Sequence, residues 1–203
     1  MHKNKNLFWL IFAIIFMVIL VIAYNKYSQF IPTSAEALTQ DQPYSLNAVD
    51  IQNIRQHSPI MEIHVYKSKR LIQLRHDTQI IRSYSMRLGF DPIGHKVQEG
   101  DGKTPEGHYV IDWRNPNSQF YKSLHISYPN AEDKKKAQDL GVSPGGNIMI
   151  HGSANHQQLK ALPQLMNYLP QKDWTWGCVA VRNTDMDEIW QLVDNGTPIV
   201  IYP

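Results

Sequence analysis

The alternation of hydrophobic and polar positions divides the chain into three parts. Residues 7–24 are apolar and carry no charge, a length that can cross a bilayer as a helix. Lys3 and Lys5 precede this run, which predicts a cytoplasmic tail over residues 1–6 and export of everything that follows. Residues 25–58 are polar and weakly periodic, so we expect a tether between the apolar run and a folded domain.

A cleaved signal peptide is the competing interpretation of the apolar run. Its best cleavage site, Ala35-Glu36-Ala37, lies too far beyond that run for ordinary processing. We therefore favour an uncleaved membrane anchor. Both interpretations place the following domain outside the cytoplasmic membrane.

Residues 59–203 contain short apolar segments with alternating polarity, the pattern of half-buried strands. The expected strands lie near residues 63–66, 71–74, 80–87, 109–113, 124–128, 148–150 and 198–202. Residues 89–107 hold two prolines and many glycines, so they form a long loop. Its GK pair lacks the glycine that begins a phosphate-binding loop, and we interpret it as a structured connection.

Helices are expected in three places. Residues 184–195 give the clearest one, with Asn183 or Thr184 as the cap and Asp185 at the positive end of the dipole. Its apolar positions recur at helical spacing and comprise Met186, Ile189, Trp190 and Val193. Further helical segments are expected near residues 48–56 and 155–169. Strands outnumber helices, which predicts one mainly β domain with a few packed helices (α+β).

Composition and charge exclude several classes of partner. The net charge is +2 and the isoelectric point about 8.6, which is only mildly basic. The longest basic run, Lys134-Lys135-Lys136, stands beside Glu132 and Asp133 and is typical of a solvated surface. Nucleic acid is therefore not an expected partner. Neither a Cys/His cluster nor an HExxH motif is present in the sequence, so no metal site or cofactor is expected.

The candidate chemistry centres on the single cysteine. Cys178 cannot form an internal disulfide, and a Cys with a His on a separate element is the minimum for a thiolate and its base. His151 follows a strand-like triplet, where an imidazole projects at the strand end. Gly177 allows a substrate carbonyl to approach closely. These residues alone leave open a buried structural Cys and a hydrogen-bonded structural His.

Three ordered segments resemble the L,D-transpeptidase catalytic domain family, also called YkuD-like. Residues 102–109 (GKTPEGHY) resemble its G-x-T-P-x-G-x-[FY] segment, and residues 144–152 (PGGNIMIHG) resemble its strand that ends in His-Gly. Residues 175–179 (TWGCV) resemble its [ST]-x-G-C-[IV] signature, and Asn183 with Asp185 its following N-x-D. The resemblance covers the whole region after the tether and implies a β-sandwich with packed helices.

The resemblance also implies a reaction on peptidoglycan stem peptides. His151 would deprotonate Cys178, whose thiolate attacks the L-centre carbonyl of diaminopimelate. A D-amino acid leaves, and an amine of a second stem peptide resolves the thioester into a cross-link. A carbonyl of Gly152 or Ser153 would orient the imidazole, while Gly177 and Cys178 would supply oxyanion N–H groups. Neither a cofactor nor a metal is implied.

Two positions depart from many members of that family. Trp176 stands where many carry a His two residues before the Cys, and Ala180 where many carry an Arg two residues after it. We expect Thr175 and Trp176 to contact the substrate. Arg182 or Lys172 would have to meet a substrate carboxylate in place of the missing arginine.

The same residues are compatible with other outcomes. Water instead of an amine would make the protein an L,D-carboxypeptidase or endopeptidase, including one that releases protein linked to peptidoglycan. The resemblance is to a divergent Gram-negative branch, which implies a periplasmic domain anchored to the inner membrane. A catalytically silent peptidoglycan-binding module is the alternative from another class, and the intact Cys178 and His151 disfavour it.

Overall fold

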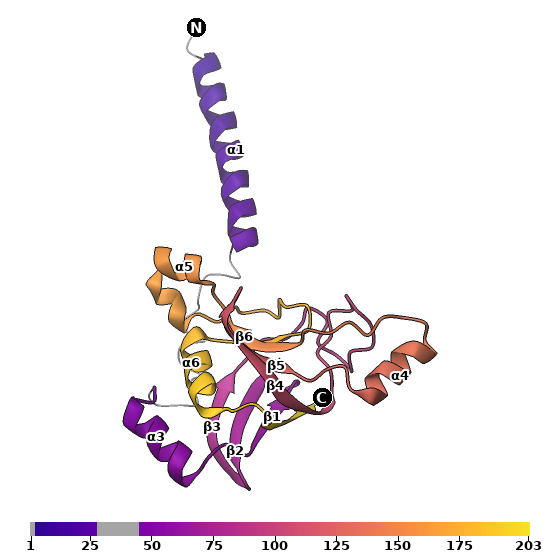
Figure 1. Cartoon of the computed structure of the whole chain (residues 1–203). Coiled ribbons are helices and arrows are strands. Elements are labelled where there is room, and N and C mark those ends of the chain that lie inside the picture. Colours follow the sequence, from indigo (N-terminus) through magenta and orange to yellow (C-terminus); the bar gives the residue numbers. More distant parts are fainter. Residues whose placement is uncertain (1–2, 28–44) are drawn as a thin grey trace.

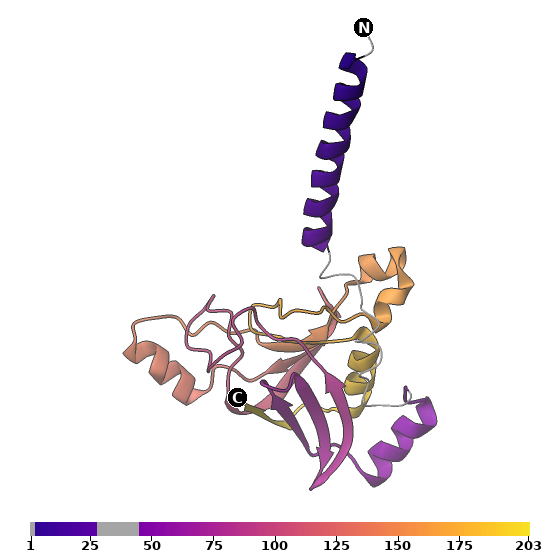
Figure 2. The ribbon, with the colours of Figure 1, turned by 180° about the vertical axis from the view of Figure 1, so that it is seen from behind.

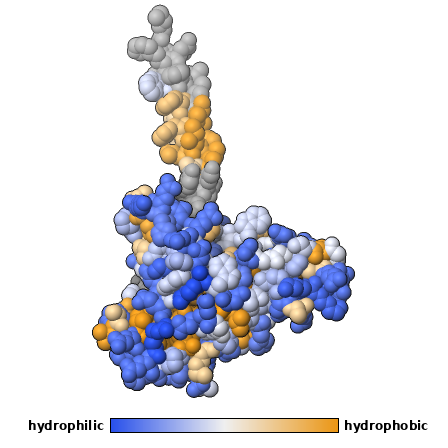
Figure 3. Space-filling view, in the orientation of Figure 1, coloured by the Kyte–Doolittle hydropathy of each residue, from blue (hydrophilic) through white to orange (hydrophobic). Residues whose placement is uncertain are grey.

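The computed structural model describes residues 3–27 and 45–203. Its first element, α1 (Lys3–Tyr27), presents an apolar surface where its side chains are described (Figure 3). No helix in the described part of the chain is both long and apolar enough to cross a membrane, so the span expected at residues 7–24 is not supported. The cleavage site considered at Ala35-Glu36-Ala37 lies outside the described residues.

Part of the expected tether belongs to the folded domain. Helix α3 (Ala48–His57) begins with a capping box, in which the Asn47 and Asp50 side chains each accept from the other's backbone N–H. Ile51 of this helix is buried in the main hydrophobic core. The expected helix near residues 48–56 is thus confirmed, and the domain begins before the predicted boundary at residue 59.

The domain is built on one mixed eight-stranded sheet (Figure 1). Its strands are β1 (Glu62–Tyr66), β2 (Leu71–His76), β3 (Gln79–Ser85), β4 (Gly107–Ser118), β5 (Tyr121–Ile126), β6 (Met149–Gly152), β7 (Val179–Val181) and β8 (Pro198–Tyr202). They are ordered β3-β2-β1-β8-β4-β5-β6-β7. Pairs β1–β8 and β6–β7 are parallel, and the other neighbours are antiparallel.

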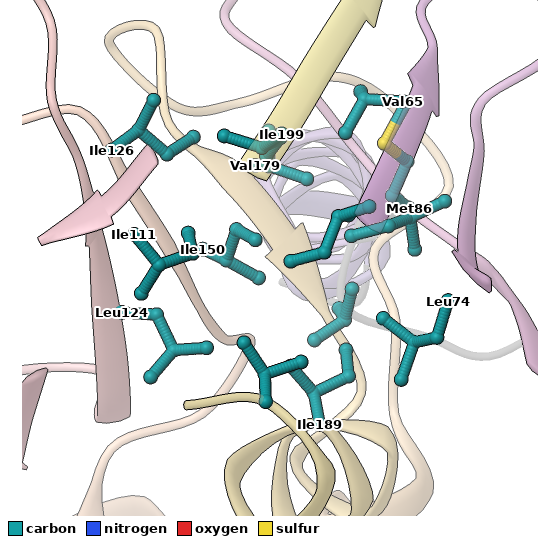
Figure 4. Close-up of a cluster of buried hydrophobic side chains, with 14 of the residues drawn as sticks. Val65, Leu74, Met86, Ile111, Leu124, Ile126, Ile150, Val179, Ile189 and Ile199 are labelled. Atoms are coloured by element: carbon teal, nitrogen blue, oxygen red, sulfur yellow. The ribbon is translucent and has the colours of Figure 1, made fainter. Parts of the chain in front are cut away.

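Strand β4 joins the two halves of this sheet. It pairs with β8 on one side, and its register with β5 shifts between Ile111 and Arg114. Apolar side chains from both halves converge on a single core (Figure 4). The predicted mixed α+β class is confirmed, and the two faces of the expected sandwich are parts of one continuous sheet.

One helix was not expected from the sequence, and one expected helical segment is divided. Helix α4 (Ala131–Asp139) is absent from the sequence-based expectations, and it carries the lysine run on its exposed side, as a solvated surface requires. Figures 1 and 2 place α4 at the opposite end of the domain from α3. Within the helical segment expected near residues 155–169, Pro163 separates α5 (His156–Ala161) from a 3₁₀ turn, η2 (Pro163–Asn167).

Helix α6 (Asn183–Leu192) packs its apolar face on β5 and β6. The expected cap is wrong: Arg182 occupies the N-cap position, and its side chain makes no capping bond. Asn183 is already helical and directs its side chain elsewhere, because it is bonded to the turn that follows β6. This bond becomes important at the candidate active site.

Candidate active site

The parallel pairing of β6 with β7 brings the expected base and nucleophile together. Ile150 lies opposite Val179, and His151 lies opposite Ala180. Cys178 stands two residues before Ala180, so it shares a sheet face with His151 and is its diagonal neighbour. Diagonal neighbours in a sheet are about 7–8 Å apart, within reach of a long side chain. Ile150 and Val179 point the other way, into the core.

The imidazole of His151 is buried and fixed in one tautomer. Its Nδ1 lies 2.6 Å from the Gly152 carbonyl oxygen. A carbonyl can only accept, so Nδ1 carries the proton and Nε2 is left as the atom that can take one. Burial lowers the pKa of His151 to about 4, although the Gly152 carbonyl acts in the opposite direction. The imidazole is therefore neutral at neutral pH.

Two aromatic rings hold the imidazole plane. Phe120 stacks on His151 with ring centroids 4.9 Å apart and an interplanar angle of 28°. Trp174 meets the same imidazole edge-on at 5.7 Å. The Phe120 carbonyl also accepts from the Gly152 N–H at 3.1 Å. Sequence reasoning did not identify Phe120 or Trp174, because their approach depends on a turn and a loop distant from β6.

Asn183 clamps the turn that carries the orienting carbonyl. Its Oδ1 accepts from the backbone N–H groups of Ser153 at 2.8 Å and Ala154 at 3.1 Å, and its Nδ2 donates to the Ala154 carbonyl at 2.9 Å. A Cβ on Gly152 would come within 2.4 Å of Asn183 Oδ1. Gly152, not Ser153, thus supplies the orienting carbonyl, while the Ser153 hydroxyl donates to the carbonyl of Tyr168.

The thiol of Cys178 is partly accessible and uncharged at rest. Its Sγ lies 3.6 Å from the carbonyl oxygen of Asn147, to which it can donate. Burial raises the pKa of the Cys178 thiol, while the backbone of Met149 and the charge of Lys96 oppose that rise. A raised thiol pKa beside a lowered imidazole pKa disfavours a preformed thiolate–imidazolium pair. Proton transfer must therefore accompany attack on a substrate.

The turn before the cysteine is held by Thr175. Its hydroxyl donates to the Cys178 carbonyl at 2.7 Å and accepts from the Gly177 N–H at 3.2 Å. Thr175 is buried, so the structure gives it a place in the turn, and its expected contact with substrate stays a prediction. The Gly177 N–H is engaged in this bond, which leaves its oxyanion role untested.

The start of the same turn is anchored by an ion pair that could not be predicted from the sequence. Arg70 Nε donates to Asp173 Oδ1 at 3.1 Å and to Oδ2 at 3.0 Å, and Arg70 Nη2 donates to Oδ2 at 2.6 Å. Asp173 Oδ1 also accepts from the Leu88 N–H at 2.9 Å. The partners come from the β1–β2 turn and from the segment after β3, so the nucleophile turn is tied to the opposite half of the sheet.

The glycine-rich loop lies against the nucleophile turn, backbone to backbone. A Cβ on Gly89 would meet the Gly102 carbonyl oxygen at 2.0 Å, and a Cβ on Gly177 would meet that of Lys103 at 2.5 Å. Gly177 also has a φ of +125°, which favours glycine. Lys67 holds this loop from below through the Thr104 carbonyl at 3.0 Å. The loop is thus part of the site and more than a connection.

The comparisons with known proteins agree with this geometry. The sequence profile of the YkuD family, the L,D-transpeptidase catalytic domain, matches residues 61–201. The chain belongs to this family. The protein named "Putative L,D-transpeptidase YafK" from Escherichia coli is 31% identical over 160 residues, which cover 72% of this chain and 54% of that protein. The chain therefore spans about half the length of the curated relatives it matches.

Solved structures support the fold. The helical cell shape determining protein Pgp2 from Campylobacter jejuni superposes with a TM-score of 0.52 at 21% identity, over 74% of this chain and 53% of that chain. A point mutant of Pgp2 gives the same TM-score at 22% identity, over 74% and 52%. At these identities the likeness concerns the fold of the L,D-transpeptidase domain alone.

The L,D-transpeptidase domain presents an aromatic surface next to its cysteine. Trp176 is 70% exposed and packs edge-on against Phe90, which is 50% exposed, with centroids 4.9 Å apart. The Phe90 ring also covers Gly102, where a Cβ would come within 2.5 Å of it. Trp176 thus lies on the exposed surface beside the cysteine turn, and its expected contact with a substrate stays a prediction.

The two cations expected to bind a substrate carboxylate differ in their exposure to solvent. Arg182 is buried, and its Nη1 lies 3.8 Å from Asp185 Oδ2. Burial raises the pKa of Asp185 to about 6, against which Arg182 acts. Lys172 is exposed in the segment before the nucleophile turn. Within residues 3–27 and 45–203, no group of three or more His, Cys, Asp or Glu residues could hold a metal ion.

Proposed function

We propose that this L,D-transpeptidase domain is a peptidoglycan-modifying cysteine acyltransferase. The observation that carries the proposal is the β6–β7 register, which sets Cys178 diagonally beside an imidazole whose Nδ1–H is held by the Gly152 carbonyl. This arrangement leaves Nε2 to receive the thiol proton. It is the arrangement that a thiol and base need for nucleophilic acyl transfer.

The substrate class follows from the family. Cys178 attacks the L-centre carbonyl of diaminopimelate in a stem peptide as His151 Nε2 takes the thiol proton. The tetrahedral intermediate collapses when the C–N bond to the terminal D-amino acid breaks, and the imidazolium returns its proton to the leaving amine. A thioester remains. An amine of a second stem peptide then attacks it, which forms a new amide and frees the thiol.

Hydrolysis of the same thioester is the second candidate. Trp176 stands where many relatives carry a His, and Ala180 where many carry an Arg, so acceptor handling differs from theirs. Water as the acceptor would shorten stem peptides or release protein linked through the same bond. A silent binding module is disfavoured, because such a module has no use for a fixed tautomer of His151 beside a thiol.

The deciding experiment is incubation of the full chain with purified disaccharide-tetrapeptide, followed by mass spectrometry. Cross-linked dimers support transfer, and shortened stems support hydrolysis. If neither product forms, both enzyme proposals are refuted. Cys178→Ala is the matched control: it should abolish either product with little change in melting temperature, because one small, partly accessible side chain is altered.

We further propose that the domain works in the periplasm, where its substrate lies. The charge-free run at residues 7–24 behind Lys3 and Lys5 motivates an attachment to the inner membrane. Fractionation of cells and N-terminal sequencing of the mature protein test both points. A mature chain that starts at Glu36 or later would show cleavage, and recovery in the cytoplasm would refute the localisation.

A further inference from the structure

A bulge in β4 sets two side chains against one on the neighbouring strand. The register with β5 shifts between Ile111 and Arg114, so that Asp112 and Trp113 together stand opposite His125. In a regular strand, two consecutive side chains point to opposite faces, whereas a bulge re-aims one of them. Both side chains contact the same imidazole. His125 Nδ1 donates to Asp112 Oδ1 at 2.6 Å, and Trp113 stacks on the His125 ring with centroids 4.8 Å apart and an interplanar angle of 15°.

His125 lies on the catalytic face of the sheet. Its neighbours Leu124 and Ile126 point into the core (Figure 4), so His125 points the other way. His125 pairs with Met149 on β6. The parallel register of β6 with β7, taken one residue back, sets Met149 opposite Cys178. One row across three strands therefore contains Cys178, Met149 and His125, and the bulge closes the end of that row.

The bulge offers groups that attract a cation. The Asp112 side chain and Trp113 are each 40% exposed. A carboxylate has about four acceptor positions, so the bond from His125 leaves others for a ligand. The face of an indole ring attracts an ammonium group. His125 holds the carboxylate and the indole next to each other, and half-buried Met149 provides an apolar floor between them and Cys178.

We infer that Asp112 and Trp113 bind the side-chain ammonium of diaminopimelate in the acyl donor. The inference rests on the proposed function. Six bonds join the reacting carbonyl carbon to the D-centre nitrogen, a reach of about 7 Å when extended. An ammonium–carboxylate contact adds about 3 Å. The sum matches the two strand spacings of about 4.8 Å between Cys178 and His125. Asp112 is thus a specificity residue for the donor.

The test compares three tetrapeptide donors, whose third residue is diaminopimelate, lysine or norleucine. Lysine keeps an ammonium at the same six-bond reach and lacks the D-centre carboxylate, while norleucine keeps an unbranched arm without charge. The kcat/KM for release of the terminal D-amino acid is measured for the full chain, for Asp112→Asn and for Trp113→Leu. This release accompanies transfer and hydrolysis alike.

Glu62→Gln is the matched control. The Glu62 side chain is also 40% exposed and is bonded to a histidine, His64, on β1 in the other half of the sheet. Its substitution removes a carboxylate from a histidine pair that lies outside the row of Cys178. Melting temperatures and alkylation by iodoacetamide report on the fold and the thiol of each variant.

Asp112→Asn should lose about 10-fold on the diaminopimelate and lysine donors, the lower end for a hydrogen bond to a charged group because the site is exposed. It should lose little on the norleucine donor, which the unaltered chain already handles poorly. Trp113→Leu should lose about two- to fivefold on the same two donors, and it carries the test if Asp112→Asn does not fold. Glu62→Gln should match the unaltered chain on all three.

An equal loss on all three donors would show a merely structural role and overturn the inference, as would no loss on any donor. A loss confined to the diaminopimelate donor would indicate recognition of its carboxylate and overturn the ammonium assignment. If the unaltered chain consumes no donor while its thiol still reacts with iodoacetamide, the proposed function fails, and the assignment of Asp112 falls with it.

Discussion

Cys178 is flanked by two walls that are built in different ways. The histidine wall (His151, Gly152, Ser153 and Asn183) is buried and held by side-chain bonds to backbone groups. The glycine wall (Gly89, Phe90, Gly102 and Gly177) is held by backbone segments that touch where no Cβ fits, and it ends in exposed aromatic rings. In the proposed mechanism, the first wall orients the base and the second forms the surface offered to a substrate.

The largest effect should come from the base in the histidine wall. His151→Ala removes the acceptor of the thiol proton, and general base catalysis contributes on the order of 10²–10⁴-fold. We expect that loss in acylation of Cys178, measured by mass spectrometry of the intact protein. His156→Ala is the control, because the His156 ring bonds to the Tyr121 carbonyl at an exposed position. A greater loss for His156→Ala would show that the base is misassigned.

The same imidazole should affect the pH dependence of stability. The folded pKa of His151 is about 4 against an ordinary 6.5, so its contribution is complete above pH 6.5 and is lost as pH falls towards 4. The loss amounts to about 3 kcal/mol in the free energy of unfolding. Asp185 opposes it, because its raised pKa of about 6 adds stability as pH falls below 6.

The comparison that isolates this effect is between the unaltered chain and His151→Gln. In urea unfolding measured from pH 7.5 down to pH 4, the unaltered chain should lose about 3 kcal/mol more unfolding free energy than His151→Gln. Asp185 contributes equally to both proteins and cancels. Parallel curves would mean that the imidazole is not buried in its neutral form.

Next in size is the clamp of the histidine wall. Asn183→Ala leaves two N–H groups and one carbonyl of residues 153–154 without their side-chain partner. Each unsatisfied buried group costs about 1–3 kcal/mol, although water entering the space offsets part of this. We expect a loss of about 3 kcal/mol in stability and a lower kcat. Asn195→Ala, beyond α6, should change neither quantity, and equal effects from both would refute the clamp.

The glycine wall should break by a different mechanism. Gly89→Ala drives a Cβ to 2.0 Å from the Gly102 carbonyl oxygen, so backbone must move. Overpacking of this kind costs about 1–3 kcal/mol, and both stability and turnover should fall. Gly146→Ala is the matched control, because its Cβ would meet nothing closer than 3.9 Å. If turnover in Gly89→Ala is unchanged, the conclusion that the glycine-rich loop is part of the site is wrong.

The two walls also differed in how far the sequence could predict them. Cys178, His151 and the strands were readable, because local motifs and apolar alternation specify them. The clamp by Asn183 and the anchor Asp173–Arg70 were not, since they join residues that are 29 to 30 and 103 positions apart.

The smallest effect should come from the exposed end of the glycine wall. Trp176 is 70% exposed and meets Phe90 edge-on, and Trp176→Phe keeps an apolar ring there. Alkylation of Cys178 by iodoacetamide should stay within about twofold, while turnover of disaccharide-tetrapeptide falls several-fold, in line with the ~0.5–1.5 kcal/mol of an aromatic contact. Tyr66→Phe, on β1 and stacked on Tyr202, is the control. If alkylation falls as much as turnover, Trp176 affects the reactivity of the Cys178 thiol itself. That result would contradict its assignment to a surface that acts only on the substrate.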